Sequence, residues 1–310
     1  MKRIVLASPR GWCAGVERAV ETVEHALEQR GAPVYVRKEI VHNSHVVRDL
    51  EARGAVFVDE VDEIPAGATV VFSAHGVAPS VHAAARARRL EAIDATCPLV
   101  SKVHAEARRY AAHGATILLI GHEGHEEVEG TIGEAPDAIV VVQSVEEAER
   151  LELPGDGPLV YLTQTTLSVD ETGAIVAVLR RRFPRIQGPP SEDICYATTN
   201  RQAAVKAMLT EIDLLLVIGS RNSSNSNRLA EVARAAGVPS HLIDDAGEIE
   251  EAWLEGKEVL GLTSGASAPE SLVAEAVSWF RARGVDDVRD AHAPENVFFR
   301  LPLAVRPAAG

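Results

Sequence analysis

The sequence predicts an α/β protein of three pseudo-repeated units, each with a small, mostly parallel sheet, arranged around a common centre. Two observations lead to this fold class. Short apolar runs alternate with helical patterns along the whole chain, and parallel strands need such crossover helices between them. In addition, the same landmarks recur at nearly equal spacings in three stretches of the chain, as expected of a structural repeat.

The expected elements follow from hydrophobic patterning and from the glycines that end helices. Short apolar runs predict strands at residues 2–7, 33–40, 55–58, 69–73, 91–96, 115–120, 138–142, 159–163, 213–218, 241–243 and 259–263. Helical patterns cover residues 16–29, 80–90, 98–113, 170–182, 199–210 and 270–282. The tail that follows is expected to cross back over the core.

Three cysteines mark the repeat, and each of them precedes a helical pattern. Cys13, Cys97 and Cys195 lie 18, 17 and 18 residues before the positions that close these helical segments, which are Gly31, Gly114 and Asp213. A polar residue that follows the next strand lies 29, 28 and 28 residues after the cysteine. We therefore expect three units that share architecture but hardly any side-chain identity. Their predicted ranges are 1–96, 97–193 and 194–310.

Composition and charge narrow the function classes. The 310 residues are 46% hydrophobic and 25% charged, as in ordinary globular proteins. A net charge of −14 argues against nucleic acid as a partner, because clustered Lys and Arg bind phosphate backbones. The chain has no apolar stretch of the kind found in signal peptides or membrane spans, and three cysteines do not make a disulfide framework. We therefore expect a cytoplasmic protein with reduced thiols and no membrane partner.

The three cysteines are candidate metal ligands. A helix start favours the thiolate through its backbone N–H groups and the helix dipole. If a pseudo-threefold axis relates the units, the three thiolates converge on one point. Three unrelated buried thiols are the simpler alternative, and zinc on three cysteines usually takes a fourth protein ligand. An iron–sulfur cluster on only three cysteines would leave one iron open to bind substrate as a Lewis acid.

Polar side chains gather just past the predicted strands. They offer imidazoles, hydroxyls, an amide and turn N–H groups, with little Lys or Arg. Such a set can bind a phosphate or diphosphate through hydrogen bonds, although each residue alone is also typical of a surface, a cap or a plain polar loop. The residues are His42, His75, His125, Ser223, Ser224, Asn225, Ser264 and Ser267.

A group of carboxylates lies beside His125 in the stretch GHEGHEEVEGT. A carboxylic acid next to an open iron can supply a proton to a leaving oxygen. Glu126 and Glu127 are the candidates for this role, whereas Glu129 is expected to face solvent. Two threonines that follow another strand, Thr165 and Thr166, can hydrogen-bond the leaving hydroxyl or orient the acid.

Nine motifs carry a family resemblance when they are taken together. They are GWCAGVERA, VHN, SAHG, DATCPLV, GHEGHEEVEGT, LTQTT, DICYATTNRQ, GSRNSSNSNRL and SGASAPES. Each is weak alone, but the combination is specific and spans nearly the whole chain. The chain resembles the 4-hydroxy-3-methylbut-2-enyl diphosphate reductase family of the non-mevalonate isoprenoid pathway.

The resemblance implies a function, a cofactor and residue roles. It implies a central [4Fe–4S] cluster on Cys13, Cys97 and Cys195. It also implies removal of the substrate hydroxyl as water with two electrons and two protons, giving isopentenyl and dimethylallyl diphosphate. Glu127 would deliver a proton, Thr165 would lie close to the hydroxyl, and ferredoxin or flavodoxin would supply electrons. The implied diphosphate contacts are His42, His75, His125, Ser223, Ser224, Asn225 and Ser267.

One position departs from the family pattern. Proline commonly follows the second histidine of GHEGHEEVEGT, whereas this chain has Glu126 there. Two adjacent carboxylates therefore compete for the role of acid. Because adjacent side chains of an extended loop point to opposite sides, only one should face the cluster. We expect that residue to be Glu127.

Two other functions compete with the reductase. An enzyme that resembles quinolinate synthase would share the triplicated plan and a three-cysteine cluster, but the constellation of histidine, glutamate and Ser-Asn residues is not typical of it. A non-catalytic cluster or zinc protein that senses iron or oxygen would have no use for a shielded acid and three diphosphate-type loops.

Overall fold

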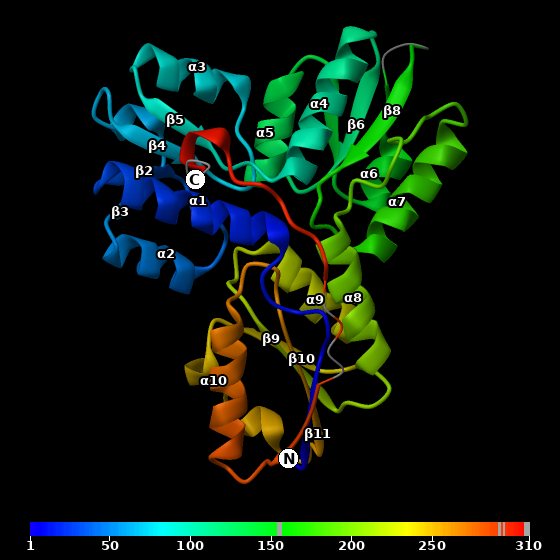
Figure 1. The fold of residues 1–310 in the computed structure, drawn as a ribbon. Coiled ribbons are helices and arrows are strands. Elements are labelled where there is room, and N and C mark those ends of the chain that lie inside the picture. Colours follow the sequence, from blue (N-terminus) through cyan, green and yellow to red (C-terminus); the bar gives the residue numbers. More distant parts are fainter. Residues whose placement is uncertain (154–156, 291–292, 294, 307–310) are drawn as a thin grey trace. The chain divides into compact units, whose positions relative to one another are not determined.

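The computed structural model describes residues 1–153, 157–290, 293 and 295–306. Strands and helices alternate along these residues (Figure 1). The described strands form three sheets, of five, four and three strands, and all the pairings between them are parallel. The predicted α/β class with three small sheets is confirmed.

The chain divides into two compact units. Unit 1 comprises Met1–Val16, His42–Arg48 and Tyr196–Phe298. Unit 2 comprises Glu17–Val41, Asp49–Cys195 and Phe299–Gly310. Unit 1 contains the five-stranded sheet, and unit 2 contains the other two sheets.

The sheet of unit 1 has the strand order β10-β9-β11-β1-β12. Its strands are β1 (Arg3–Leu6), β9 (Leu214–Ile218), β10 (Ser240–Ile243), β11 (Val259–Ser264) and β12 (Asp287–Asp290). Its helices are α8 (Tyr196–Met208), α9 (Ser224–Ala235) and α10 (Glu270–Arg281), with short 3-10 turns at Ala246–Glu248 and Glu251–Leu254.

The central strand β9 separates two cores of unit 1, because successive side chains of a strand point to opposite faces. Leu216 and its alternate neighbours pack with Phe280 and other side chains of α10. Leu215 and Val217 face the other way and pack with side chains of α8 and α9, including Met208. A strand that is buried on both faces reads as a continuous apolar run, which is why LLLVI was recognisable in the sequence.

Unit 2 contains two sheets, with strand orders β3-β2-β4-β5 and β7-β6-β8. The first comprises β2 (Val34–Arg37), β3 (Ala55–Val58), β4 (Thr69–Phe72) and β5 (Glu91–Asp94). The second comprises β6 (Thr116–Ile120), β7 (Ile139–Val142) and β8 (Leu159–Thr163). Helices α3 (Pro79–Ala87), α4 (Pro98–Ala112), α5 (Glu126–Glu134), α6 (Val145–Arg150) and α7 (Val169–Arg182) belong to the same unit, as do the 3-10 turns Val61–Glu63 and Leu303–Val305.

Strand β6 divides the cores around the three-stranded sheet in the same way as β9. Ile117 and Leu119 pack with side chains of α4 and α5, including Val128. Leu118 and Ile120 pack on the opposite face with side chains of α6 and α7. Helices therefore cover both faces of this sheet, as Figure 1 shows. In sheets of this kind, ligands bind at the carboxyl ends of the strands.

The predicted ranges 1–96, 97–193 and 194–310 stay a prediction, although the sheets largely follow them. The four-stranded sheet lies within the first range and the three-stranded sheet within the second. Strand β1 differs, because it pairs with β11 on one side and β12 on the other and so completes the sheet of the last range. Beyond β12, the carbonyls of Arg300 and Val305 accept hydrogen bonds from Arg18 and Gln29 of α1 (Ala14–Arg30).

Four helices, α2 (Ser44–Ala52), α5, α6 and α9, lie outside the helical patterns of the sequence. Of these, α2, α5 and α9 each begin with polar or charged residues. Hydrophobic periodicity is weak at such polar helix starts, so the pattern alone did not reveal them. The difference matters because candidate binding residues lie at the first turns of these helices.

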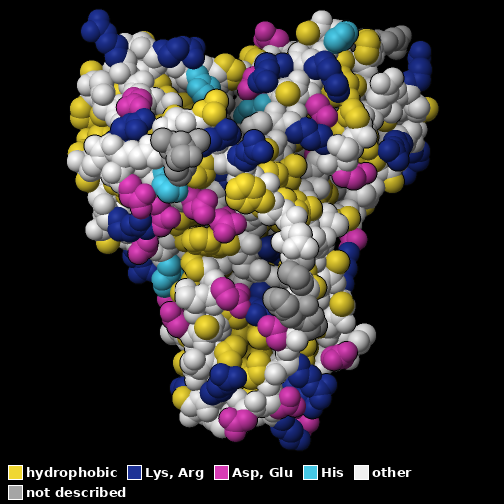
Figure 2. All heavy atoms as spheres, viewed as in Figure 1, with side chains coloured by type: hydrophobic (Ala, Val, Ile, Leu, Met, Phe, Trp, Pro, Cys, Tyr) yellow, Lys and Arg dark blue, Asp and Glu magenta, His cyan; other side chains and the backbone are white. Residues whose placement is uncertain are grey.

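The charges of the protein are of both signs. Acidic and basic side chains both lie on the face drawn in Figure 2, within a net charge of −14. Among the described residues, none of the helices has the length and apolarity that crossing a membrane requires.

Candidate active site

The backbone of each cysteine makes the same hydrogen bond. In each case the cysteine N–H donates to a carbonyl in the loop that follows a strand, and a helix begins at the next residue. The three bonds are Cys13 to Ala266 after β11 at 3.2 Å, Cys97 to Ala74 after β4 at 2.9 Å, and Cys195 to Thr165 after β8 at 3.1 Å. The predicted repeat thus exists at the level of the backbone, and β1 with Cys13 belongs to the last copy.

The thiols themselves are partly buried. No disulfide joins any of the three cysteines. In Cys13 the helix start acts as expected, since the N–H groups of Gly15 and Val16 favour the thiolate, but burial acts more strongly and raises the pKa of the Cys13 thiol. Nearby charges act with opposite signs, because Arg201 lowers this pKa and Glu295 raises it.

Glu127 is a deeply buried acid of unit 2. It lies in the first turn of α5, and the residue is 2% exposed. The N–H of Thr165 donates to Glu127 Oε1 at 2.7 Å, and Thr165 Oγ1 donates to Glu127 Oε2 at 3.0 Å. The carboxyl group is therefore held by one residue, Thr165, whose carbonyl also accepts the hydrogen bond from the N–H of Cys195.

Burial raises the pKa of Glu127 to about 7. Desolvation is the largest cause, because it penalises the charged carboxylate. The two hydrogen bonds from Thr165 lower the pKa and so oppose this effect, and the negative charge of Asp193 raises it. A carboxylic acid with a pKa near neutrality is suited to general acid catalysis.

Glu126 faces other partners than Glu127. Its Oε2 lies 3.4 Å from both Ser73 Oγ and His75 Nδ1. The expectation that the two glutamates lie on an extended loop is wrong, because both belong to the first turn of α5. Neighbouring residues on a helix still point in different directions, so the adjacent carboxyl groups reach separate partners.

His125 and His75 lie close together beside these glutamates. His125 is the N-cap of α5, and its Nδ1 accepts a hydrogen bond from the N–H of Glu127 at 3.1 Å. In the neutral imidazole this leaves the proton on Nε2, which becomes a donor. The rings of His75 and His125 meet edge to face with centroids 5.9 Å apart. Unit 2 thus brings together His75, His125, Glu127 and Thr165.

In unit 1, three predicted phosphate ligands occupy the start of α9. Ser223 is the N-cap, Ser224 is the first helical residue, and Asn225 follows. Backbone N–H groups at a helix start point outward and attract anions. Ser223 and Asn225 are each 4% exposed. The side chain of Ser223 already caps the helix by accepting from the N–H of Ser226 at 3.3 Å.

Asn225 also links the phosphate candidates to a cysteine. Its Oδ1 accepts from the N–H of Ala266 at 2.9 Å, and its Nδ2 lies 3.3 Å from Thr198 Oγ1. The carbonyl of Ala266 in turn accepts from the N–H of Cys13. The amide therefore has a structural role in addition to any contact with a ligand.

His42 and Ser267 also lie together in unit 1. Ser267 Oγ donates to the carbonyl of His42 at 2.8 Å, and Asn222 Nδ2 lies 3.4 Å from His42 Nδ1. The next residue, Asn43, accepts through Oδ1 from the N–H groups of His45 and Val46, as a cap of α2 does. His42 and Ser267 thus each lie between a strand and the helix that follows it.

Several residues with a structural role at the site were not assigned one from the sequence. The buried carboxylate of Asp193 accepts from the N–H of Thr163 at 3.0 Å and from Lys102 Nζ at 2.9 Å, which fixes the segment before Cys195. Tyr196 Oη accepts from the N–H of Ala14 at 3.0 Å. Asp193 and Tyr196 both lie inside the motif DICYATTNRQ, but their spacing gives no sign of their partners.

The fold and the site define an α/β enzyme with a buried carboxyl group of raised pKa and helix starts suited to an anionic ligand. The chain belongs to the LytB protein family, whose model matches residues 4–281.

Similar proteins of known name cover nearly the whole chain. A 4-hydroxy-3-methylbut-2-enyl diphosphate reductase of Acidothermus cellulolyticus is 60% identical over 98% of this chain and 90% of its own length. One of Mycolicibacterium paratuberculosis is 60% identical over 99% of this chain and 93% of its own. The solved structure of the E-1-hydroxy-2-methyl-but-2-enyl-4-diphosphate reductase from Plasmodium falciparum has a TM-score of 0.95 at 38% identity, and the match covers 98% of this chain and 96% of that one.

The raised pKa of Glu127 predicts a pH-dependent loss of stability. The folded state holds this proton up to about pH 7, whereas the unfolded state releases it near 4.5, so rising pH favours unfolding between these values. Glu127→Gln removes the effect. Relative to the native protein, the variant should gain about 3 kcal/mol of unfolding free energy between pH 4.5 and pH 8, measured by urea denaturation.

Glu129→Gln is the matched control, because it makes the same chemical change on an exposed side chain of the same helix. Its unfolding free energy should stay within about 0.5 kcal/mol of the native value at both pH values. A pH-independent difference between Glu127→Gln and the native protein would contradict the assignment of Glu127 as a neutral buried acid.

Proposed function

We propose that the chain catalyses the reductive dehydroxylation of 4-hydroxy-3-methylbut-2-enyl diphosphate. The reaction takes two electrons and two protons, releases water and forms isopentenyl and dimethylallyl diphosphate. The family membership and the names of relatives that are about 60% identical over nearly the full length support this proposal. The observation that carries it is the Glu127–Thr165 pair, a buried acid with a pKa of about 7.

The donor set fits an iron–sulfur cluster. Three partly buried thiols without a disulfide, each at a helix start with a hydrogen-bonded N–H, are typical thiolate ligands for such a cluster. We propose Cys13, Cys97 and Cys195 as the ligands of a [4Fe–4S] cluster. When bound, the cluster would supply electrons and one Lewis-acidic iron without a cysteine ligand.

The predicted polar residues suit the diphosphate group. The starts of helices α5 and α9 offer N–H groups, and His125 offers an Nε2–H donor, because its Nδ1 accepts from Glu127. None of these groups needs a permanent positive charge, which agrees with the small number of Lys and Arg in the motifs. The proposed diphosphate contacts are His42, His75, His125, Ser223, Ser224, Asn225 and Ser267.

The hydrogen bonds of Glu127 locate its proton. The N–H of Thr165 is always a donor, so Glu127 Oε1 must accept. In the neutral acid we place the proton on Oε2, which then donates to Thr165 Oγ1 across the same 3.0 Å, whereas the ionised carboxylate accepts from this hydroxyl. We propose that this proton passes through the Thr165 hydroxyl to the hydroxyl that leaves the substrate. The second carboxylate, Glu126, has its own partners and takes no part in this path.

Two further properties stay predictions. Ferredoxin or flavodoxin is expected to deliver the electrons, and the protein is expected in the cytoplasm. The proposed reaction needs electrons but no particular donor protein, so it can be tested with a chemical reductant.

Anaerobic turnover with a reduced dye tests the proposal. The purified protein should contain about four irons per chain and convert the hydroxylated diphosphate, while Cys13→Ser, Cys97→Ser and Cys195→Ser should each lose activity. Glu127→Gln should lose about 10²-fold or more of kcat, the usual contribution of a general acid, and Glu126→Gln should lose far less. Zinc in place of iron, or an active Glu127→Gln with an inactive Glu126→Gln, would overturn the assignment.

The relay through Thr165 predicts a shifted pH profile. The rate should fall as pH rises through about 7, because Glu127 loses its proton. Thr165→Val removes a hydrogen bond that favours the ionised acid, so the midpoint of the fall should move to higher pH and the plateau rate should drop. Thr165→Ser keeps the hydroxyl and should keep the midpoint. An unchanged midpoint in Thr165→Val would argue against the pairing.

A further inference from the structure

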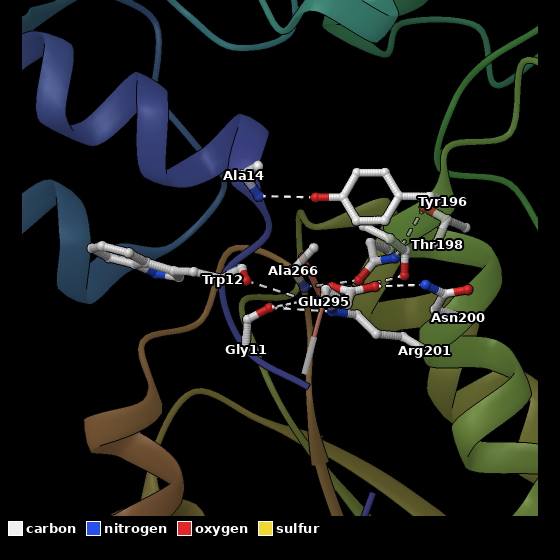
Figure 3. Close-up of polar contacts among 11 residues, drawn as sticks. Gly11, Trp12, Ala14, Tyr196, Thr198, Asn200, Arg201, Ala266 and Glu295 are labelled. Carbon is white, nitrogen blue, oxygen red and sulfur yellow. Dashed lines mark hydrogen bonds and ion pairs between the residues drawn. The ribbon is translucent and has the colours of Figure 1, made fainter. Parts of the chain in front are cut away.

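Arg201 is a fully buried cation of unit 1 that contacts the loop of residues 11–13, called here the Cys13 loop. The residue is 0% exposed, and it lies on α8. Its Nε and Nη2 donate to the carbonyl of Gly11 at 3.1 and 2.7 Å, and Nη2 also donates to the carbonyl of Trp12 at 3.3 Å. Figure 3 shows the guanidinium pointing at these two carbonyls. The side chain thus holds the two residues that precede Cys13.

Glu295, from the segment that follows β12, completes the site. Its Oε2 accepts from Arg201 Nη1 at 2.9 Å, and its Oε1 accepts from Asn200 Nδ2 at 2.8 Å (Figure 3). The Glu295 side chain is 14% exposed. A buried cation requires such a partner, because leaving it unpaired is costly.

The contacts of Arg201 exclude two simpler roles. A guanidinium has five N–H donors, and Arg201 makes five hydrogen bonds within the protein, the fifth to the carbonyl of Ala197 at 3.1 Å. No donor is left for a diphosphate. Nor is the side chain suited to proton transfer, because a guanidinium keeps its charge in proteins. What remains is mechanical support and the electric charge.

We propose that Arg201 and Glu295 are positioning residues that hold the Cys13 loop and together set the charge beside the Cys13 sulfur, and with it the reduction potential of the bound cluster. The proposal rests on the cluster of the proposed function. It also gives the segment after β12 a role, since Glu295 is the counter-charge that this segment contributes.

The physical basis is the opposite charge of the two side chains. Reduction adds a negative charge to the cluster, so a nearby cation stabilises the reduced form and a nearby anion destabilises it. A buried charge acts strongly because water screens it little. Arg201 therefore raises the potential, and Glu295 limits that increase while keeping the cation in place.

Two neutralising substitutions separate the charge effect from mechanical support. Glu295→Gln retains polar contacts with Arg201 and Asn200 but removes the negative charge, so the potential should rise. Arg201→Gln removes the positive charge, so the potential should fall. Each shift should correspond to a change of up to about tenfold in the ratio of oxidised to reduced cluster, which is about 59 mV for a one-electron couple. Arg201→Lys keeps the charge and should stay near the native potential.

Anaerobic redox titration of the purified holoenzyme, followed by electron paramagnetic resonance and with iron content measured in parallel, provides the readout. Asp287→Asn and Arg3→Gln are the matched controls, because this exposed pair makes the same charge changes at the start of β12 and β1. Arg3 lies at the end of β1 that is farther along the chain from Cys13, so this pair serves as a control for charge changes elsewhere in the same sheet. The control potentials should not move.

Shifts of the same sign in Glu295→Gln and Arg201→Gln, or no shift in a fully loaded Glu295→Gln, would overturn the inference. If Arg201→Gln fails to retain iron, Glu295→Gln and Arg201→Lys still decide, since their potentials are predicted to differ. A native protein that binds no cluster would instead refute the proposed function.

Discussion

Burial of one carboxylic acid against one threonine is the interaction on which the proposed chemistry depends. In water, Glu127 would be ionised at neutral pH and could not donate a proton. Its position in the first turn of α5, packed against the end of β8, removes water from the group and raises its pKa to about 7. The two hydrogen bonds with Thr165 then fix the orientation of the carboxyl group. Position and acidity thus come from the same packing.

The carboxyl ends of the strands position the proposed cluster and substrate ligands through backbone groups. Each cysteine N–H is fixed by a strand-end carbonyl, and candidate anion ligands occupy the starts of α5 and α9. Neither device depends on a particular side chain. This explains how three sheets can be followed by the same backbone arrangement at a cysteine while the surrounding sequences share little.

The sequence predicted the parts of the site that lie next to strands. Buried parallel strands are continuous apolar runs, so their ends, and with them Cys97, His125 and Thr165, could be located. The choice of Glu127 over Glu126 agrees with the partners that the two carboxyl groups reach, although the loop assumed for it is the first turn of a helix. Helices α2 and α9 were not predicted, because their first turns are polar and show little hydrophobic periodicity.

Other features could not be predicted because their partners are distant in sequence and follow no period. Arg201 and Glu295 lie 94 positions apart, and Arg201 holds a loop 190 positions away. Strand β1 joins β11, although it precedes the four-stranded sheet in the chain. Such pairings are decided by the packing of the whole unit rather than by local pattern.

The protonation state of Glu127 can be measured directly. Infrared difference spectroscopy of the native protein against Glu127→Gln reports the carbonyl stretch of a protonated carboxyl group. Glu127 should be protonated below neutrality and should ionise with a midpoint near pH 7. An ionised Glu127 throughout the range from pH 5 to pH 9, in an enzyme that is active at neutral pH, would contradict this prediction.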